Sequence, residues 1–131
     1  MGLFSSKKTC MDTEIHEQPE ILQKILNEYV ANDGKITFEM PNDIQKVVLV
    51  ASGSSYHCAR FGADLFGKVA NVSARAIYSS EYLLKPKAPD EEDILYVFIT
   101  QSGETSDTLR AAKRAKQMNM RIACITNNNK S

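Results

Sequence analysis

The sequence has 131 residues, 43% hydrophobic and 24% charged, which suits one globular domain with a sizeable core. Lysine plus arginine and aspartate plus glutamate each number 16, so no net field attracts nucleic acid or an anionic membrane surface. No apolar run approaches the ~20 residues of a transmembrane helix and no secretory signal is present, so we expect a cytoplasmic protein with neither nucleic acid nor membrane as a partner.

The N-terminal part of the chain is predicted to be a flexible leader followed by a helical arm. Residues 1–11 have no periodic pattern, whereas residues 12–31 carry apolar side chains at helical spacing among acidic ones. Pro19 marks either a kink or the first turn of a second helix, and Asn32-Asp33-Gly34 ends the arm. We expect residues 12–131 to form a single domain. The apolar positions of the arm are Ile15, Ile21, Leu22, Ile25, Leu26 and Tyr29.

Strands and helices alternate over the rest of the chain. Two uninterrupted apolar runs, 46–51 and 94–99, predict parallel strands that are buried on both faces. Alternation of this kind predicts an α/β fold with three layers, αβα, around a flavodoxin-like parallel sheet of about four to five strands. The other predicted elements are strands at 74–78 and 121–126, helices at 56–69, 80–84 and 105–118, and a polar loop at 86–93.

Hydroxyl-rich loops follow the two strongest strands, Ser52–Tyr56 after the first and Thr100–Thr108 after the second. Ligands of such folds bind outside the carboxyl ends of the strands, and each loop directly precedes a helix, whose free amides and dipole favour an anion. Gly53 permits a sharp turn or the close approach of a ligand. Serine, threonine and aspartate also cap helices, but two such loops at one sheet edge exceed what capping requires. They predict a phosphate-binding site.

Other chemistries lack their motifs. The phosphate-binding P-loop, the Gly-x-Gly-x-x-Gly dinucleotide fingerprint and the Gly-x-Ser-x-Gly nucleophile elbow are absent, and His16-Glu17 is followed by Glu20 where a zinc helix needs a second histidine. We therefore expect no metal and no cofactor. The three cysteines have no paired spacing, which fits a reducing compartment, and Cys58 and Cys124 stand in apolar segments, so we expect them in the core.

Four segments resemble the sugar isomerase (SIS) domain family, and within it the isomerase half of glutamine:fructose-6-phosphate aminotransferase. They are residues 14–19 (Glu-Ile-His-Glu-Gln-Pro), 50–56, 79–82 and 100–108 (Thr-Gln-Ser-Gly-Glu-Thr-Ser-Asp-Thr), in a resemblance that spans residues 11–127. The resemblance implies that fructose 6-phosphate or glucosamine 6-phosphate is the ligand. The residues implied to contact its phosphate and hydroxyls are Ser54, Ser55, Thr100, Gln101, Ser102 and Thr105, with Gly53 and Gly103 allowing close approach.

The sequence also departs from that family. Ser52-Gly53-Ser54-Ser55 stands where the family usually has Cys-Gly-Thr-Ser, and Gly2 follows the initiator methionine where the family's glutamine-hydrolysing domain has its catalytic cysteine. The family's second SIS subdomain, which supplies proton-transferring residues, has no counterpart here. We expect a first SIS subdomain, truncated relative to the two-subdomain isomerase, without the glutaminase domain and inactive by itself.

Two alternatives stay open: a non-catalytic phosphosugar-sensing or regulatory module, and an independent isomerase completed by dimerisation. The catalytic residues are unknown, because the acids and bases near the loops, His57, Glu81 and Glu104, are more simply structural. We expect the arm to mediate a homodimer.

Overall fold

The computed structural model describes residues 9–37, 43–84 and 93–128. Contacts divide the chain into two compact units, residues 1–41 and residues 42–131. The predicted leader falls outside the described residues up to position 8, as does all but Asp93 of the predicted polar loop at 86–93.

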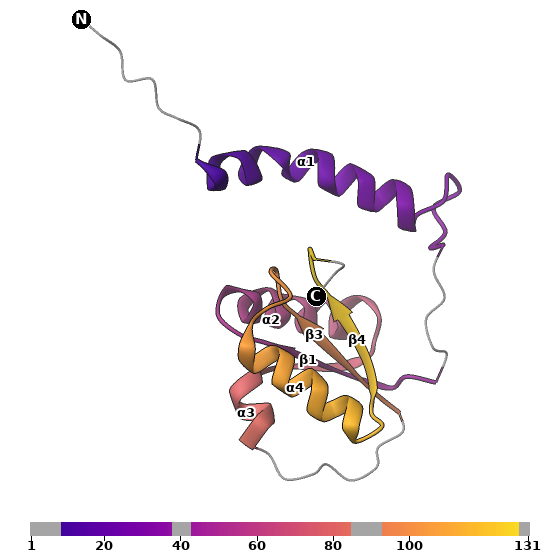
Figure 1. Ribbon diagram of the computed structural model, residues 1–131. Helices are drawn as coiled ribbons and strands as arrows, with labels where there is room; N and C mark the ends of the chain where they lie inside the picture. The colour runs from indigo at the N-terminus through magenta and orange to yellow at the C-terminus, as the bar shows by residue number, and fades with distance from the viewer. Residues whose placement is uncertain (1–8, 38–42, 85–92, 129–131) are drawn as a thin grey trace, which may run out of the picture. The chain divides into compact units, whose positions relative to one another are not determined.

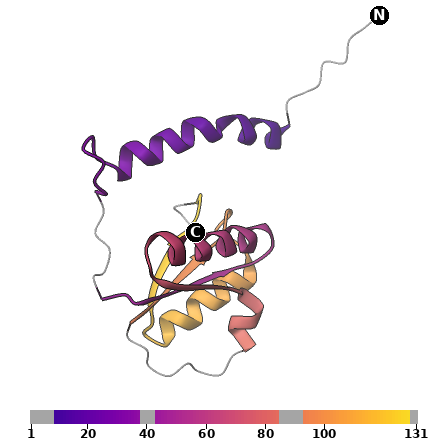
Figure 2. The ribbon, with the colours of Figure 1, turned by 180° about the vertical axis from the view of Figure 1, so that it is seen from behind.

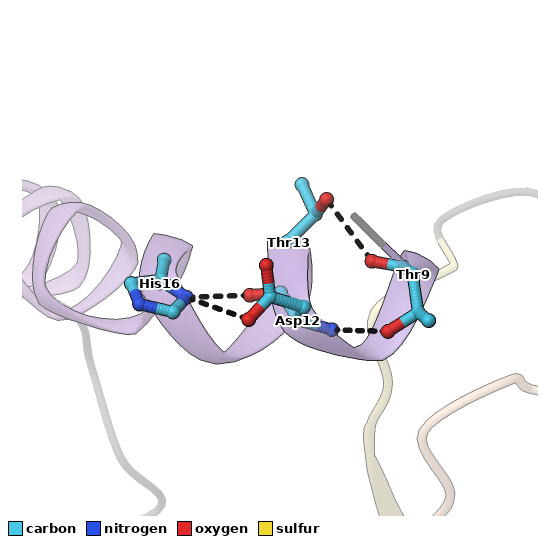
Figure 3. A network of polar contacts seen from close by, with 4 residues as sticks. All are labelled: Thr9, Asp12, Thr13 and His16. Atoms are coloured by element: carbon cyan, nitrogen blue, oxygen red, sulfur yellow. Dashed lines mark hydrogen bonds and ion pairs between the residues drawn. The ribbon is translucent and has the colours of Figure 1, made fainter. Parts of the chain in front are cut away.

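Helix α1 (Cys10–Tyr29) makes up most of the first unit and begins two residues earlier than predicted. The backbone N–H of Asp12 donates to Oγ1 of Thr9, 3.1 Å away, so Thr9 is a side-chain cap (Figure 3). The hydroxyl of Thr13 donates to the Thr9 carbonyl, and Nδ1 of His16 lies 2.7 Å from the Asp12 carbonyl oxygen. The cap extends the helix into the region whose sequence has no apolar period.

Pro19 lies inside α1, and the run that it interrupts forms one helix. None of the residues of α1 is buried; Ile15 is 54% exposed and Leu22 is 60% exposed. After α1, Val30 and Ile36 form an antiparallel bridge around a turn. Within the first unit, the other described residues do not cover the apolar stripe of α1.

The described residues of the second unit form a four-stranded parallel sheet in the order β2-β1-β3-β4, which confirms the predicted α/β class. β1 and β3 lie in the centre and pair in register, with Ala51 opposite Ile99. β4 is at the edge and its side chains are largely exposed. The strands are β1 (Lys46–Ala51), β2 (Ser73–Tyr78), β3 (Ile94–Ile99) and β4 (Arg121–Ile125).

Helices cover both faces of this sheet, as predicted (Figures 1 and 2). Odd-numbered residues of β1 belong to a core on the side of α2, which includes the fully buried Ala59. Even-numbered residues belong to a core on the side of α3 and α4 that contains Tyr82, Phe98 and Ala111. A strand buried on both faces needs an unbroken apolar sequence, which is what β1 and β3 have. The helices are α2 (Ser54–Val69), α3 (Ser79–Leu84) and α4 (Ser106–Gln117).

Cys58 and Cys124 are both exposed, so the expectation of buried thiols is wrong. Cys58 precedes Ala59, the α2 residue that faces the sheet, and is turned away from the core. Cys124 lies on the edge strand β4, although partial burial still raises the pKa of its thiol. Apolar neighbours in the sequence predicted burial, and the place of each residue on its element decided otherwise.

Candidate phosphosugar site

The first candidate loop is a single tight turn between β1 and α2. Gly53 has φ 57° and ψ −136°, a conformation that glycine adopts and that side chains disfavour. The backbone N–H of Tyr56 donates to the Gly53 carbonyl over 3.1 Å. Helix α2 begins at Ser54, two residues earlier than predicted, so Ser54 and Ser55 lie in its first turn rather than before it. Ser54 is exposed and Ser55 is half-buried.

The second candidate loop, between β3 and α4, is closed by its own side chains. Oγ1 of Thr100 and Oγ1 of Thr105 are 2.9 Å apart. The backbone N–H of Glu104 donates to Oγ of Ser102 over 3.1 Å, and Gly103 is buried with φ 72°. Ser102 and its neighbour Gln101 are exposed. The loop thus has a braced base, made by the two threonines, and an exposed tip.

A third loop, which follows β4, braces the second and was missed by the sequence analysis. The backbone N–H of Asn127 donates to the carbonyl of Gln101 over 3.1 Å. The side-chain amide of Asn128 donates to the carbonyl of Ser102 over 3.4 Å. Three polar residues after a strand, 126–128, were a usable signal, because the carboxyl ends of parallel strands share one edge.

The starts of the two helices show whether the residues before them act as side-chain caps. Neither Gly53, which precedes α2, nor Thr105, which precedes α4, makes a side-chain cap hydrogen bond. The Thr105 hydroxyl pairs with Thr100 instead. Helix capping therefore does not explain the hydroxyl at position 105. The first-turn amides of α2 and α4 have no side-chain cap from these positions, and the free amides of a helix start favour an anion.

Three hydroxyls meet next to the loops: those of Thr108 and Ser79, which are buried, and that of Ser52, which is half-buried. The sequence analysis placed Ser52 and Thr108 in the two loops but assigned none of the three to ligand contact. Oγ1 of Thr108 lies 2.9 Å from Oγ of Ser79 and 3.4 Å from Oγ of Ser52. These side chains come from the β1–α2 loop, the first residue of α3 and the first turn of α4. Residue type alone could not single them out, because they are 29 and 56 positions apart along the chain.

The acids and bases near the loops lie at the surface. His57, Glu81 and Glu104 are all exposed, and the ring of His57 contacts Tyr56 edge-on with centroids 6.0 Å apart. Nowhere in the described ranges do three or more histidine, cysteine, aspartate or glutamate residues group to hold a metal ion. None of the described helices is long and apolar enough to span a membrane.

A separate hollow lies at the opposite edge of the sheet, at the amino ends of the strands. Lys46, Ser73 and Arg75 contribute to its lining. It is remote from both candidate loops, because parallel strands carry them at their carboxyl ends.

Comparison with known proteins matches residues 42–131 to the SIS domain model. A glutamine–fructose-6-phosphate aminotransferase (isomerizing) of Campylobacter jejuni is 35% identical over 121 residues, which cover 89% of this chain and 20% of that protein. The corresponding aminotransferase of a Nostoc species is 37% identical over 119 residues, covering 84% of this chain and 19% of that protein. This chain therefore spans about a fifth of the length of these curated relatives.

Solved structures also resemble this chain over part of their length. The C-terminal domain of glucosamine-fructose-6-phosphate aminotransferase from Francisella tularensis superposes with a TM-score of 0.80 at 28% identity, over 99% of this chain and 38% of that one. A glucosamine-6-phosphate deaminase from Thermotoga maritima has a TM-score of 0.69 at 29% identity, over 91% of this chain and 35% of that one.

Proposed function

This chain belongs to the SIS domain family, and we propose that it binds a phosphosugar between its β1–α2 and β3–α4 loops. One observation carries the proposal: Ala51 pairs with Ile99, so the two loops leave the sheet side by side and at the same level. Each leads into a helix whose preceding residue supplies no side-chain cap. A phosphate held there meets two positive helix ends together with exposed hydroxyls.

The proposed contacts are the eight residues predicted from the sequence. We group them by their exposure and by their hydrogen bonds within the loops. Ser54 and Ser102 are exposed and can donate directly to phosphate or sugar oxygens. Thr100 and Thr105 face one another and hold the base of the loop, so we assign their hydroxyls to loop shape as well as to ligand contact. Backbone and side-chain groups of Ser55, Gln101, Gly53 and Gly103 complete the proposed set.

The names of the relatives point to the ligand class. The curated relatives are named for fructose 6-phosphate, as is the Francisella tularensis structure, whose name also includes glucosamine, and the Thermotoga maritima structure is named for glucosamine 6-phosphate. We propose fructose 6-phosphate or glucosamine 6-phosphate as the ligand and amino-sugar biosynthesis as the setting. Because the chain spans about a fifth of the aminotransferases, we propose that it contributes sugar-phosphate binding, while residues elsewhere move the protons.

Titration calorimetry of the 131-residue chain with millimolar fructose 6-phosphate tests the proposal. Ser102→Ala removes one hydroxyl that would meet a charged oxygen, and such hydrogen bonds contribute about 1.5–3 kcal/mol, so affinity should fall about 10- to 100-fold. Ser73→Ala is the matched control, an exposed serine at the opposite edge of the sheet. Unphosphorylated fructose should give no heat. An absence of heat from the wild-type chain, or equal affinities for Ser102→Ala and wild type, would refute the assignment.

We also propose that α1 pairs with a second copy of the chain. Ile15, Leu22 and Ile25 lie on one stripe, and most of the stability of a helix in a protein comes from the packing of its apolar face. Light scattering should give a dimer mass for the wild type and a monomer mass for Leu22→Glu, while Gln23→Glu on the polar side leaves the dimer intact. A monomeric wild type would exclude this role of the arm.

A further inference from the structure

We propose that Thr108 is a positioning residue for the phosphosugar site, holding the β1–α2 loop and the start of α4 at a fixed separation. The inference rests on the proposed function and adds residues to which that function assigns no ligand contact. Thr108 stands at the centre of the group of three hydroxyls, 2.9 Å from Ser79 and 3.4 Å from Ser52, measured between hydroxyl oxygens.

Burial prevents two of these three side chains from reaching a ligand. Thr108 is 1% exposed and Ser79 is 0% exposed. A bound sugar phosphate outside the sheet edge cannot contact either of them. An effect of their removal on binding must therefore pass through the loops that they hold.

The hydroxyl of Thr108 is not explained by packing. The buried positions of α4 are Thr108, Ala111 and Ala115, and the two alanines belong to the core beneath α4. Valine has the shape of threonine and would fill the same space, whereas a buried hydroxyl is costly unless it has a partner. In the part of the chain that the structure describes, the partners of this hydroxyl are Ser52, in the β1–α2 loop, and Ser79, the first residue of α3.

The contacts of Thr108 link the two loops that are proposed to bind one ligand, and their separation must match that ligand. Ser52 directly precedes Gly53, and Thr108 lies three residues after Thr105, in the first turn of α4. The Thr108–Ser52 contact therefore joins one loop to the start of the other loop's helix. Ser79, the first residue of α3, connects Thr108 to the segment that follows β2. The Thr100–Thr105 contact lies within one loop and cannot supply this connection.

Calorimetry of the full 131-residue chain with fructose 6-phosphate tests the inference with three variants. Thr108→Val keeps the shape and removes the hydroxyl, and we expect affinity to fall about tenfold, as one lost hydrogen bond can cause. Thr108→Ser keeps the hydroxyl and loses a methyl group, and we expect affinity within about threefold of wild type. Ser79→Ala should weaken binding in the same direction as Thr108→Val, and the double variant should bind no worse than Thr108→Val, because both act through one contact.

Rescue by serine separates positioning from a structural role. Urea unfolding of each variant checks that the compared proteins are folded at the titration temperature. If Thr108→Val fails to fold, the affinity of Ser79→Ala tests the inference in its place. Wild-type affinity in folded Thr108→Val and Ser79→Ala would overturn the inference while leaving the proposed function intact. Equal losses in Thr108→Val and Thr108→Ser would also overturn it. If the wild-type chain binds no phosphosugar, the proposed function falls and this inference falls with it.

Discussion

Replacing Gly53 with alanine tests whether the β1–α2 turn is set by backbone conformation. A Cβ atom built at this position has no heavy atom within 4 Å, so the substitution causes no clash. The remaining cost is the backbone conformation itself, because φ 57° with ψ −136° is disfavoured for a residue with a side chain. Holding a residue in such a region costs about 1–3 kcal/mol.

Gly67→Ala is the matched control, because it makes the same change inside the helix that Gly53 precedes, with the opposite expected sign. Gly67 lies inside α2, and its added Cβ also meets nothing within 4 Å. Alanine is favoured over glycine in a helix by roughly 0.5–1 kcal/mol. Gly53→Ala should therefore destabilise the second unit while Gly67→Ala stabilises it.

Urea unfolding followed by the near-ultraviolet circular dichroism of the tyrosines measures both variants. The chain has five tyrosines and no tryptophan, and the stacked pair Tyr56 and Tyr78, with ring centroids 3.6 Å apart, reports on this end of the sheet. In thermal unfolding, each kcal/mol corresponds to about 4–8 °C for a unit of this size. A Gly53→Ala protein as stable as wild type would show that the turn does not require the glycine conformation.

Three further predictions concern the core, an ion pair and a thiol. Phe98→Ala should destabilise the second unit by about 3–5 kcal/mol in urea unfolding, because Phe98 is 1% exposed at the centre of the sheet; a loss below about 1 kcal/mol would contradict the packing. Two hydrogen bonds of 2.6 Å from Arg121 lower the pKa of Asp43, so its contribution to stability is present above its unfolded pKa of about 3.9 and is lost as the pH falls through the lower folded value. The stability difference between wild type and Asp43→Asn should therefore shrink in acid, and a difference that grows would refute this sign. Burial raises the pKa of Cys124, so iodoacetamide at pH 8 should alkylate it more slowly than a small model thiol, as measured by mass spectrometry.

Sequence patterns predicted β1 and β3 at the residues where the structure has them, because a strand buried on both faces must be apolar throughout. Helix starts were less predictable, because the same serines and threonines fit a loop, a cap or a first turn. Ser54 and Ser55 were expected before α2 and lie within it. The start of α1 depended on Thr9, whose hydroxyl caps a segment without an apolar period.

The location of the candidate site was also predictable in outline. Alternating strands and helices predict a parallel sheet, and a parallel sheet brings the loops after successive strands to one edge. The exposure of Cys58 and Cys124 was not predictable, because it depends on which side of α2 faces the sheet and on β4 being the edge strand. Local composition contains neither fact.

The sequence by itself determined the α/β class, the central strands and the two hydroxyl-rich loops, because buried strands and sharp turns each require particular residue types along a short stretch of chain. Only the tertiary structure decided how the hydroxyls are used. It paired Thr100 with Thr105, and it brought Ser52 and Ser79 to Thr108 from distant parts of the chain. A hydrogen bond depends on distance in space, and the strand order β2-β1-β3-β4 sets that distance.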